Sequence, residues 1–297
     1  MKERSRTARP RLGIIGSGIA GLTAAWLLKE RFEVTLFEAH ERPGMGAFTA
    51  ELPLAEGHHL VDVPTRVFCA GYYPQLYQLL AHIGVELEAT DHAAAYADEQ
   101  GKTYFHYANL RLLGRSISRL SLRSARSPKA LKMAWAAQGF FAQVRADQRR
   151  LPALQNISFE RYLQQSQSSA DFVDGLLMPA LCVILTCSPE EARAYPADLL
   201  LAYLGSGVMQ QGVMRASLGV GDVVDRLIGG VKLRCGSRVA EVRPGKTSST
   251  VLLEDGHREE FAQVVMAAQA QHSAQMLPPE HGASALLQTV PWARSQM

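Results

Sequence analysis

A glycine-rich turn between two apolar segments is the feature of this chain that most restricts its fold. Residues 12–15 are apolar except for Gly13, and Gly16, Gly18 and Gly21 follow at the spacing GxGxxG. Apolar residues then recur at helical spacing, and a second apolar segment, 33–37, ends at Glu38. This order predicts strand, glycine turn, helix, strand and acid, which is the βαβ unit that holds the ADP half of a dinucleotide.

Each part of this unit has its own role in the expected binding. Gly16 allows a tight turn, Gly18 lets the backbone approach a pyrophosphate, and Gly21 lets the helix pack closely on the sheet. The helix N-terminus offers free N–H groups and the positive end of its dipole to the phosphates. Glu38 is expected to accept hydrogen bonds from the ribose hydroxyls, and dinucleotide binding is therefore favoured over a chance glycine turn.

The uncharged run 12–28 after a basic leader also permits another interpretation. Lys2, Arg4, Arg6, Arg9 and Arg11 precede it, as basic residues precede a secretory signal or a short membrane anchor. The glycines and the short length of the run argue against a membrane span. We expect a solvated basic tail, with a signal peptide as the alternative.

Composition excludes several classes of protein. The chain has 297 residues, 47% of them hydrophobic and 20% charged, which is ordinary for a cytoplasmic globular protein of one large or two smaller domains. A net charge of +3 is too small to indicate nucleic acid. The cysteines, Cys69, Cys182, Cys187 and Cys235, form no CxxC pair, so no metal site is expected and buried free thiols are favoured.

The segment after Glu38 resembles a known family. Glu38-Ala39 followed by Arg42-Pro43-Gly44 is similar to the motif of the FAD-dependent amine oxidase and phytoene desaturase superfamily, in particular its bacterial amine-oxidase-like NAD/FAD-binding proteins. The resemblance implies an α/β fold, with a Rossmann-like FAD-binding domain and a mixed α+β substrate domain. It also implies FAD as cofactor, an arginine that neutralises its pyrophosphate, and an adenine contact through the backbone of Val239. The expected cofactor-binding residues are Gly16, Ser17, Gly18, Ile19, Ala20, Gly21, Glu38, Ala39, Arg42, Gly44, Gly46 and Val239.

Two positions depart from the family's pattern. Met45 stands where the second glycine of Arg-x-Gly-Gly is usual, and Pro64 stands where another glycine is usual. A side chain at Met45 fits if its φ is negative and is strained if its φ is positive. No second GxGxxG with a strand before it and an acid after it is present, so a separate NAD(P)H site is not expected.

The resemblance also predicts the domain boundaries. Residues 1–71 and 205–275 would form a discontinuous FAD-binding domain, and residues 72–204 and 276–297 would form the substrate domain. Relatives continue beyond this length, so the family's C-terminal part is expected to be missing. Hairpins are predicted over 94–107, with a turn at Gln100-Gly101, and over 248–266, with a turn at Asp255-Gly256.

Residues 111–150 carry an unusual charge balance, with ten lysines or arginines and one acid, Asp147. Arg111, Arg115, Arg119 and Arg123 recur every four residues, which would place them on one face of a helix. Aromatic and apolar residues follow, so peripheral contact with an anionic membrane surface is one interpretation. The favoured alternative is a solvated basic face.

Three functions fit these observations. The first is an FAD-dependent oxidoreductase that takes a hydride from an apolar or amine substrate, for which no catalytic side chain can be named. The second is a non-catalytic or truncated dinucleotide-binding protein, favoured by Met45 and Pro64. The third is a flavin-dependent isomerase or mutase.

Overall fold

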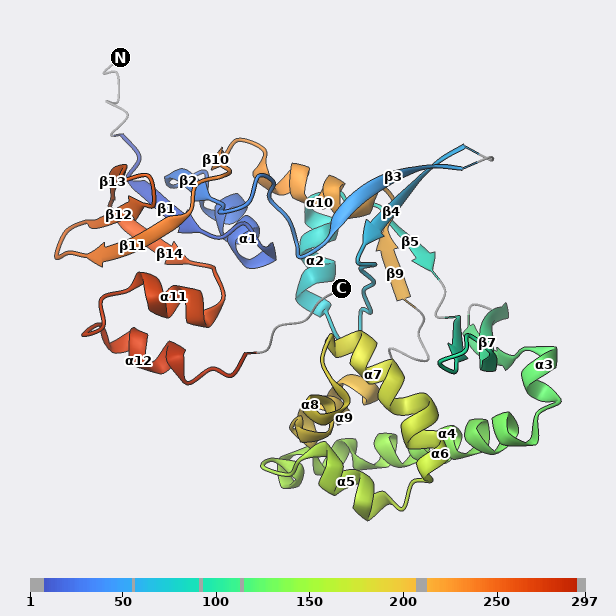
Figure 1. Ribbon diagram of the computed structural model, residues 1–297. Helices are drawn as coiled ribbons and strands as arrows, with labels where there is room; N and C mark the ends of the chain where they lie inside the picture. Colours follow the sequence, from blue (N-terminus) through green and yellow to red (C-terminus); the bar gives the residue numbers. More distant parts are fainter. Residues whose placement is uncertain (1–7, 55–56, 91–92, 113–114, 207–212, 293–297) are drawn as a thin grey trace. The chain divides into compact units, whose positions relative to one another are not determined.

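The chain folds into two compact units, each with its own hydrophobic core. The structure, a computed structural model, describes residues 8–54, 57–90, 93–112, 115–206 and 213–292 (Figure 1). The first unit takes in the chain up to Arg66, Leu80–Glu86 and Ala216–Trp292. The second takes in Val67–Leu79 and Leu87–Arg215. The first unit is therefore discontinuous in sequence, and the second unit lies between its N-terminal and C-terminal segments.

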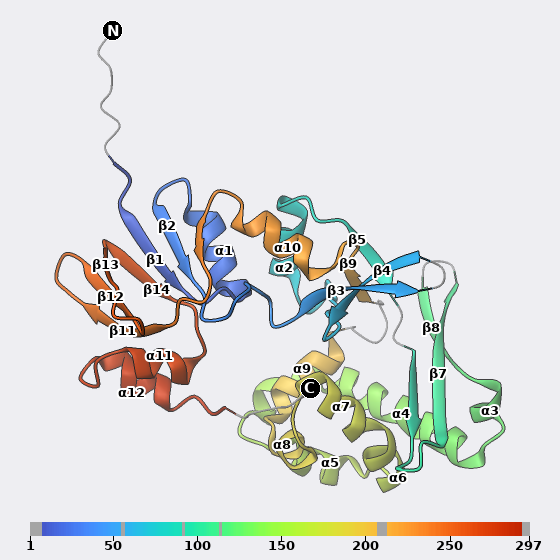
Figure 2. The same ribbon diagram turned by 45° about the horizontal axis from the view of Figure 1, so that its top comes forward.

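A parallel four-stranded sheet forms the centre of the first unit (Figure 2). Its strand order is β10-β2-β1-β14, with β1 at Arg11–Ile15, β2 at Glu33–Phe37, β10 at Lys232–Arg234 and β14 at Gln263–Met266. Helix α1 (Ile19–Leu28) connects β1 to β2 and contacts both strands, and α10 (Gly219–Ile228) packs against α1. This arrangement confirms the predicted βαβ unit and the Rossmann-like α/β fold.

The basic residue that begins β1 has a structural partner. Arg11 Nη2 lies 2.5 Å from Glu259 Oε2, and its guanidinium stacks over the ring of Phe261 at 4.6 Å. The prediction that Arg11 belongs to a solvated tail is therefore wrong, because the last residue of that basic run pairs within the sheet. The leader residues 1–7 lie outside the described part of the chain.

An antiparallel three-stranded sheet, β11-β12-β13, completes the first unit with two short helices. The strands are β11 (Val239–Pro244), β12 (Ser249–Leu253) and β13 (Arg258–Phe261), and the helices are α11 (Ala270–Met276) and α12 (Gly282–Gln288). The predicted turn at Asp255-Gly256 is confirmed, with Gly256 at φ +85°. The predicted second strand is wrong in part: Arg258–Phe261 pairs with β12, while Gln263–Met266 pairs in parallel with β1. Ala262 divides the two strands and donates its N–H to the carbonyl of Arg11.

A hairpin and the helix it contacts also belong to the first unit. Strands β3 (Phe48–Leu54) and β4 (Gly57–Val63) pair in antiparallel register, from Phe48 opposite Val63 to Leu54 opposite Gly57. Both strands contact α10. Helix α2 (Pro74–His82) follows β4 in the chain.

Strands of the second unit form two small sheets. One pairs β5 (Leu87–Thr90) with β9 (Val213–Ala216), and the other has the order β6-β7-β8. Strands β6 (Ala94–Ala97) and β7 (Thr103–Leu112) confirm the hairpin that turns at Gln100-Gly101. The helix predicted across Arg111–Arg123 is wrong: β8 (Arg115–Leu120) pairs with β7, and only α3 (Leu122–Ala125) is helical. Residues four apart share a face in a strand as well as in a helix, so the arginine spacing did not decide between them.

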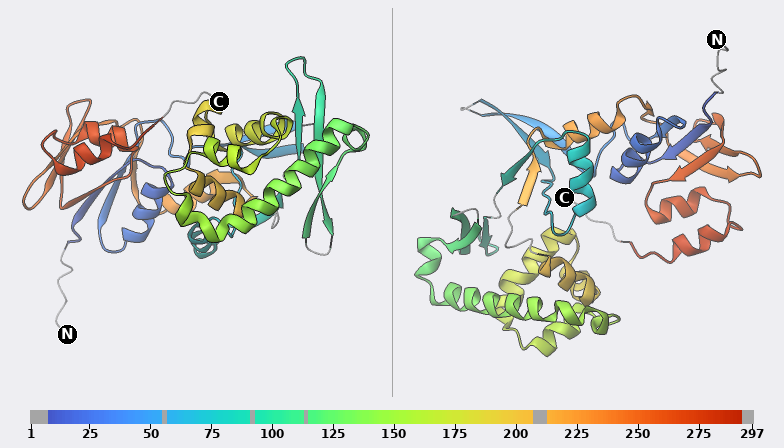
Figure 3. Two further views of the ribbon diagram at one scale, coloured as in Figure 1. Left: turned by 90° about the horizontal axis from the view of Figure 1, so that it is seen from below. Right: turned by 180° about the vertical axis from the view of Figure 1, so that it is seen from behind.

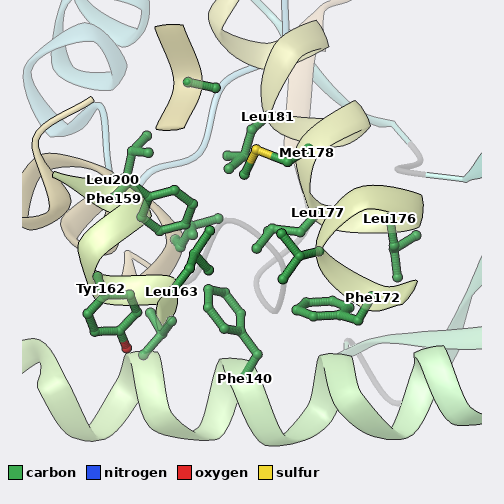
Figure 4. Packing of buried hydrophobic residues seen from close by; sticks show 14 of the residues in the cluster. Phe140, Phe159, Tyr162, Leu163, Phe172, Leu176, Leu177, Met178, Leu181 and Leu200 are labelled. Carbon is green, nitrogen blue, oxygen red and sulfur yellow. The ribbon is translucent and has the colours of Figure 1, made fainter. Parts of the chain in front are cut away.

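Helices make the core of the second unit. They are α4 (Pro128–Asp147), η1 (Gln148–Leu154), α5 (Phe159–Ser166), α6 (Ala170–Phe172), η2 (Val173–Leu177), α7 (Met178–Leu185), α8 (Pro189–Ala194) and α9 (Ala197–Gly205). Figure 4 shows Phe140 of α4 pointing into this core between Tyr162 and Phe172. The ring centroid of Phe140 is 6.4 Å from that of Tyr162 and 5.4 Å from that of Phe172. Edge-to-face and tilted rings at these spacings add to the stability that area burial provides.

The compact units differ from the predicted domains at several boundaries. Residues 67–71, 205–206 and 213–215 group with the second unit, and residues 80–86 and 276–292 group with the first. The grouping of residues 276–292 has a physical cause, because Met276 and Leu277 are buried in the core formed by β11, β12 and Phe261. The functional assignment of the two domains stays a prediction.

Candidate functional site

The turn between β1 and α1 has the tight backbone conformation that its glycines predict. Gly16 has φ +99°, a conformation that L side chains rarely adopt, and donates its N–H to the Phe37 carbonyl at 2.8 Å. A Cβ on Gly16 would also lie 2.9 Å from the Ala267 carbonyl oxygen. The turn is therefore held against the ends of β2 and β14, at the carboxyl edge of the parallel sheet where ligands of such folds bind.

Two further glycines act in different ways. A Cβ on Gly21 would lie 1.9 Å from the Gly16 carbonyl oxygen, so only glycine fits where α1 crosses the turn. A Cβ on Gly18 would meet no atom within 4 Å, so the space in front of this residue is open. Gly21 therefore serves packing, and Gly18 leaves room for a ligand.

The N-terminus of α1 carries no cap from the protein. Gly18 is its N-cap residue, no side chain caps it, and its first turn contains no acid. The first N–H groups of a helix have no partner within the helix and attract an anion. At the start of this ten-residue helix, the open space at Gly18 and the missing cap fit a phosphate group.

Glu38 directly follows β2, beside this helix start. Its Oε2 accepts from the Ser17 N–H at 3.0 Å and from the Ser17 hydroxyl, and its Oε1 accepts from the His40 N–H at 2.9 Å. Burial raises the pKa of Glu38, but the hydrogen bonds from Ser17 and His40 outweigh it and leave the pKa below its ordinary value. The ionised carboxylate keeps acceptor capacity at Oε1 for a further donor.

The backbone of the loop after Glu38 shows whether a side chain at Met45 is strained. Gly46 has φ +70°, whereas Met45 is not among the described residues that have positive φ. The left-handed conformation therefore falls on a glycine, and the Met45 side chain is tolerated without backbone strain.

The two other predicted residues of this loop are Gly44 and Arg42. A Cβ on Gly44 would lie 3.4 Å from the Ala47 carbonyl oxygen, which is an ordinary van der Waals contact. Arg42 is exposed and places its guanidinium 5.6 Å from the centre of the Phe48 ring.

A second arginine reaches this loop and was not predicted from the sequence. Arg66 Nη2 donates to the Gly46 carbonyl at 2.6 Å, and its Nε is buried with no hydrogen-bond partner among the described residues. A buried cationic donor without a partner is costly unless a ligand or water satisfies it. Arg66 lies 20 residues after Gly46, so no local motif marks it.

A cavity of about 190 Å³ lies beside the same loop in the first unit. It is lined by Arg42, Pro43, Ala47, Phe48, Thr49, Val220, Gly221, Val224 and Asp225. The α10 side of this cavity is fixed by hydrogen bonds: the Val220 N–H donates to Asp62 Oδ1 at 2.9 Å, and the Gly221 N–H donates to Thr49 Oγ1 at 2.8 Å. Unlike α1, α10 therefore has two of its first N–H groups, those of Val220 and Gly221, bonded to side chains of the protein.

The remaining predicted residues also lie in the first unit. Ile19 and Ala20 form the first turn of α1, and Ala39 follows Glu38. Val239 begins β11, pairs with Leu253 and is buried in the core of that unit. All twelve predicted cofactor-binding residues therefore belong to one compact unit, and their contact with a cofactor stays a prediction.

The described residues hold neither a metal cluster nor a membrane-spanning helix. No group of three or more His, Cys, Asp or Glu side chains could bind a metal ion there, and the four cysteines are free thiols. Within the same residues, no helix is both long enough and apolar enough to cross a membrane.

Comparison with protein families gives one match across most of the chain. Residues 19–294 match the family described as flavin containing amine oxidoreductase. This match includes α1, the loop after Glu38 and both compact units.

Solved structures of similar fold agree with that match. A putrescine oxidase redesigned in its cofactor binding is 16% identical with a TM-score of 0.66, and covers 95% of this chain and 63% of its own. Cyclohexylamine oxidase from Brevibacterium oxydans IH-35A is 16% identical, with a TM-score of 0.62 and coverage of 94% and 63%. A CLA-producing fatty acid isomerase from P. acnes is 12% identical, with a TM-score of 0.62 and coverage of 96% and 64%. The chain thus spans less than two thirds of the length of these proteins, and at this identity they support its fold alone.

Proposed function

Because this chain belongs to the family of flavin containing amine oxidoreductases, we propose that it is an FAD-dependent oxidoreductase acting on an organic small molecule. Its substrate would be an amine or an apolar compound that gives up a hydride. The observation that carries the proposal is the uncapped start of α1 beside the ionised Glu38, both at the carboxyl edge of the parallel sheet.

Each proposed cofactor contact follows from the geometry of a residue. The N–H groups of Gly18, Ile19 and Ala20 would hold the pyrophosphate, because the start of α1 is open to solvent. Glu38 would accept from the ribose hydroxyls through its remaining acceptor capacity.

The loop would supply the positive charge that a pyrophosphate needs. Arg42 is exposed and would offer its guanidinium, and Arg66 would offer its buried Nε, which has no hydrogen-bond partner among the described residues. The backbone between Gly44 and Gly46 would follow the cofactor, and Val239 would contact the adenine through its backbone. The unmet Nε of Arg66 is the group in this unit that most needs an anionic partner.

Bound flavin would supply the acceptor for the hydride. In this proposal the protein's own part would be to bind and orient the cofactor, with Glu38 ionised beside the start of α1. We assign no catalytic side chain.

A flavin-dependent isomerase or mutase is the second candidate. It uses the same nucleotide-binding unit without net oxidation, and the fatty acid isomerase of similar fold favours keeping it. A non-catalytic dinucleotide-binding protein is the third. Met45 and Pro64 favoured it in the sequence. Met45 no longer counts against cofactor binding because the positive φ of this loop falls on Gly46, whereas Pro64 still stands where the family's pattern has a glycine.

The visible spectrum of the purified chain tests the proposal directly. A yellow protein that dithionite bleaches is expected, either as purified or after FAD is added and excess is removed. A chain that stays colourless and binds no FAD would contradict all flavin-dependent candidates. Oxygen uptake with putrescine or cyclohexylamine supports the oxidoreductase, whereas double-bond rearrangement of a fatty acid without oxygen uptake supports the isomerase.

Location and partners also belong to this proposal. We propose a cytoplasmic protein with a small-molecule substrate and without a nucleic-acid partner. Peripheral contact with an anionic membrane through residues 111–150 is the alternative to a solvated basic face. The support is the basic charge of that segment, which holds ten lysines or arginines and one acid.

A further inference from the structure

Three large apolar side chains stand exposed on adjacent helices of the second unit. Leu122 in α3 is 70% exposed, and in α4 Leu131 is 47% and Trp135 is 80% exposed. Leu131 and Trp135 are four residues apart, so they lie on the same face of α4. An exposed tryptophan of this degree is unusual on a monomer's surface when apolar neighbours accompany it.

The opposite side of α4 explains why these residues face outward. Ala130, Met133, Phe140 and Val144 are buried in the core of the second unit, and α4 contacts α6 and α9. Figure 3 shows α4 running as a long helix beside the shorter helices of this unit. The inner face of α4 is therefore already packed, and Leu131 and Trp135 have no place in that core.

Cations surround the exposed apolar residues. Arg119, Arg123, Arg126, Lys129 and Lys132 are all exposed. Lys129 lies 3.6 Å from Asp171, whereas no ion pair within the described residues involves Arg123, Arg126 or Lys132. The one acid of the segment, Asp147, is buried at the other end of α4, where it accepts from the Tyr162 hydroxyl. Apart from the Lys129–Asp171 pair, the cations of this surface have no ion-pair partner among the described residues.

The geometry points to an anionic lipid bilayer as the partner of this surface. We propose that α3 and the first half of α4 dock on such a bilayer, with Trp135, Leu131 and Leu122 entering the interface. Arg123, Arg126 and Lys132 would then bind lipid phosphates. Tryptophan favours the headgroup level of a membrane, and each nearby Lys or Arg strengthens binding to an anionic surface.

This inference narrows the membrane contact proposed above for residues 111–150 and rests on it. Strand β8 contributes Arg119 at its end, but the helical face predicted from Arg111 and Arg115 does not exist. A nucleic-acid partner fits less well, because phosphate binding alone gives no role to three exposed apolar side chains. The docking surface is defined by Arg123, Arg126, Lys132 and the three apolar residues.

Co-sedimentation with vesicles tests the surface without any use of the flavin. The full chain should bind vesicles of phosphatidylserine and phosphatidylcholine, bind phosphatidylcholine alone far less, and be released by salt. Each cation removed from the docking surface should weaken vesicle binding about fivefold, because a Lys or Arg near an anionic surface contributes about 1 kcal/mol. We therefore expect Arg126→Gln combined with Lys132→Gln to weaken it about 25-fold. Lys102→Gln, an exposed lysine on a turn of the same unit, is the matched control and should bind as the parent does.

Tryptophan fluorescence tests the insertion. A variant with Trp26→Phe and Trp292→Phe keeps Trp135 as its one tryptophan, and its emission should shift to shorter wavelength with anionic vesicles. No shift, or equal binding to neutral vesicles, would overturn the inference. Binding that is unchanged in Arg126→Gln/Lys132→Gln would place the membrane contact elsewhere in 111–150, and binding to RNA or DNA without binding to vesicles would assign the surface to nucleic acid. Either result contradicts the docking surface defined above. Circular dichroism of each variant checks that it is folded.

Discussion

At the scale of single residues, Gly18 and Gly21 separate cofactor binding from folding. A Cβ on Gly21 would overlap the Gly16 carbonyl oxygen at 1.9 Å, so Gly21→Ala should destabilise the first unit by about 1–3 kcal/mol or more. Gly18 has φ −66° and open space, so Gly18→Ala should change stability by less than about 1 kcal/mol. It should nevertheless weaken FAD binding, because its methyl group would occupy the expected phosphate site.

Urea unfolding and FAD titration of the two variants measure these effects separately. If Gly18→Ala binds FAD as tightly as the parent, the phosphate does not lie at the start of α1. If Gly21→Ala is as stable as the parent, the packing of α1 against the turn is looser than the structure describes.

Glu38 gives a pH dependence with a definite sign. Its hydrogen bonds with Ser17 and His40 hold its pKa below the ordinary value of 4.5. A carboxyl whose pKa is lower in the folded state stabilises that state above its unfolded pKa, and this contribution is lost as the pH falls through the folded pKa. The urea midpoint of the parent should therefore exceed that of Glu38→Gln at pH 6, and the difference should shrink below pH 4.5. A difference that stays constant across this range would show that the charge of Glu38 plays no part.

Arg66 is the residue whose role the sequence did not reveal. If its unpartnered Nε binds the pyrophosphate, Arg66→Gln should weaken FAD binding by about 1.5–3 kcal/mol, the range for a hydrogen bond to a charged group. Arg31→Gln, an exposed arginine after α1 in the same unit, is the matched control. Equilibrium titration with FAD measures the affinity of both variants. An equal loss of affinity in both would mean that Arg66 acts only through the net charge of the protein and not through a contact with the pyrophosphate.

At the scale of elements, α10 depends on side chains from the β3–β4 hairpin. Asp62 is 6% exposed, and its Oδ1 accepts from the Val220 N–H at 2.9 Å and from the Thr49 hydroxyl at 2.8 Å. Asp62→Ala leaves the Val220 N–H without its acceptor and should cost about 1–3 kcal/mol of stability. Asp62→Asn keeps an oxygen acceptor of the same shape and should cost less. Urea unfolding followed by circular dichroism compares the two, and equal losses would mean that the carboxylate charge, not the hydrogen bond, holds α10.

The elements differ, for physical reasons, in how well the sequence predicts their secondary structure and pairing. The βαβ unit was predictable because buried parallel strands are continuously apolar and the glycine turn marks where a strand passes into a helix. Strand β8 was not, because a spacing of four residues fits a helix face and a strand face equally, and pairing with β7 decided the outcome. Pairing of β14 with β1 joins residues about 250 apart in sequence, as the partners Leu12 and Gln263 show, and no local pattern encodes it.

The same distinction holds in the candidate site. Gly16, Gly18, Gly21 and Glu38 were found because their spacing carries the geometry. Arg66 reaches Gly46 through a fold in the chain that includes the whole β3–β4 hairpin, so only the three-dimensional structure brings them together. The tolerance of Met45 depended on a single φ angle that composition does not report.

At the scale of the whole molecule, the two units have separate cores, and all predicted cofactor residues belong to one of them. A ligand that binds only the folded form stabilises it by mass action, by about 2.7 kcal/mol at one hundred times its dissociation constant. FAD should therefore slow amide hydrogen exchange in β1, α1 and β2 of the first unit. Exchange in the buried stretches of α4, α5 and α9 should change much less, because none of the predicted contacts lies there.

Hydrogen exchange with mass spectrometry, with and without saturating FAD, resolves these segments in one experiment. The parent and Gly18→Ala form the comparison, since the variant should fold normally but lose the protection of β1, α1 and β2. Protection that appears equally in α4, α5 and α9 would mean that the second unit also contacts the cofactor. Protection confined to α4, α5 and α9 would instead contradict the assignment of the glycine turn as the phosphate site. FAD would then bind away from the start of α1. Among the described residues, that helix start combines open space at its N-cap glycine with the ionised Glu38 at the end of the next strand.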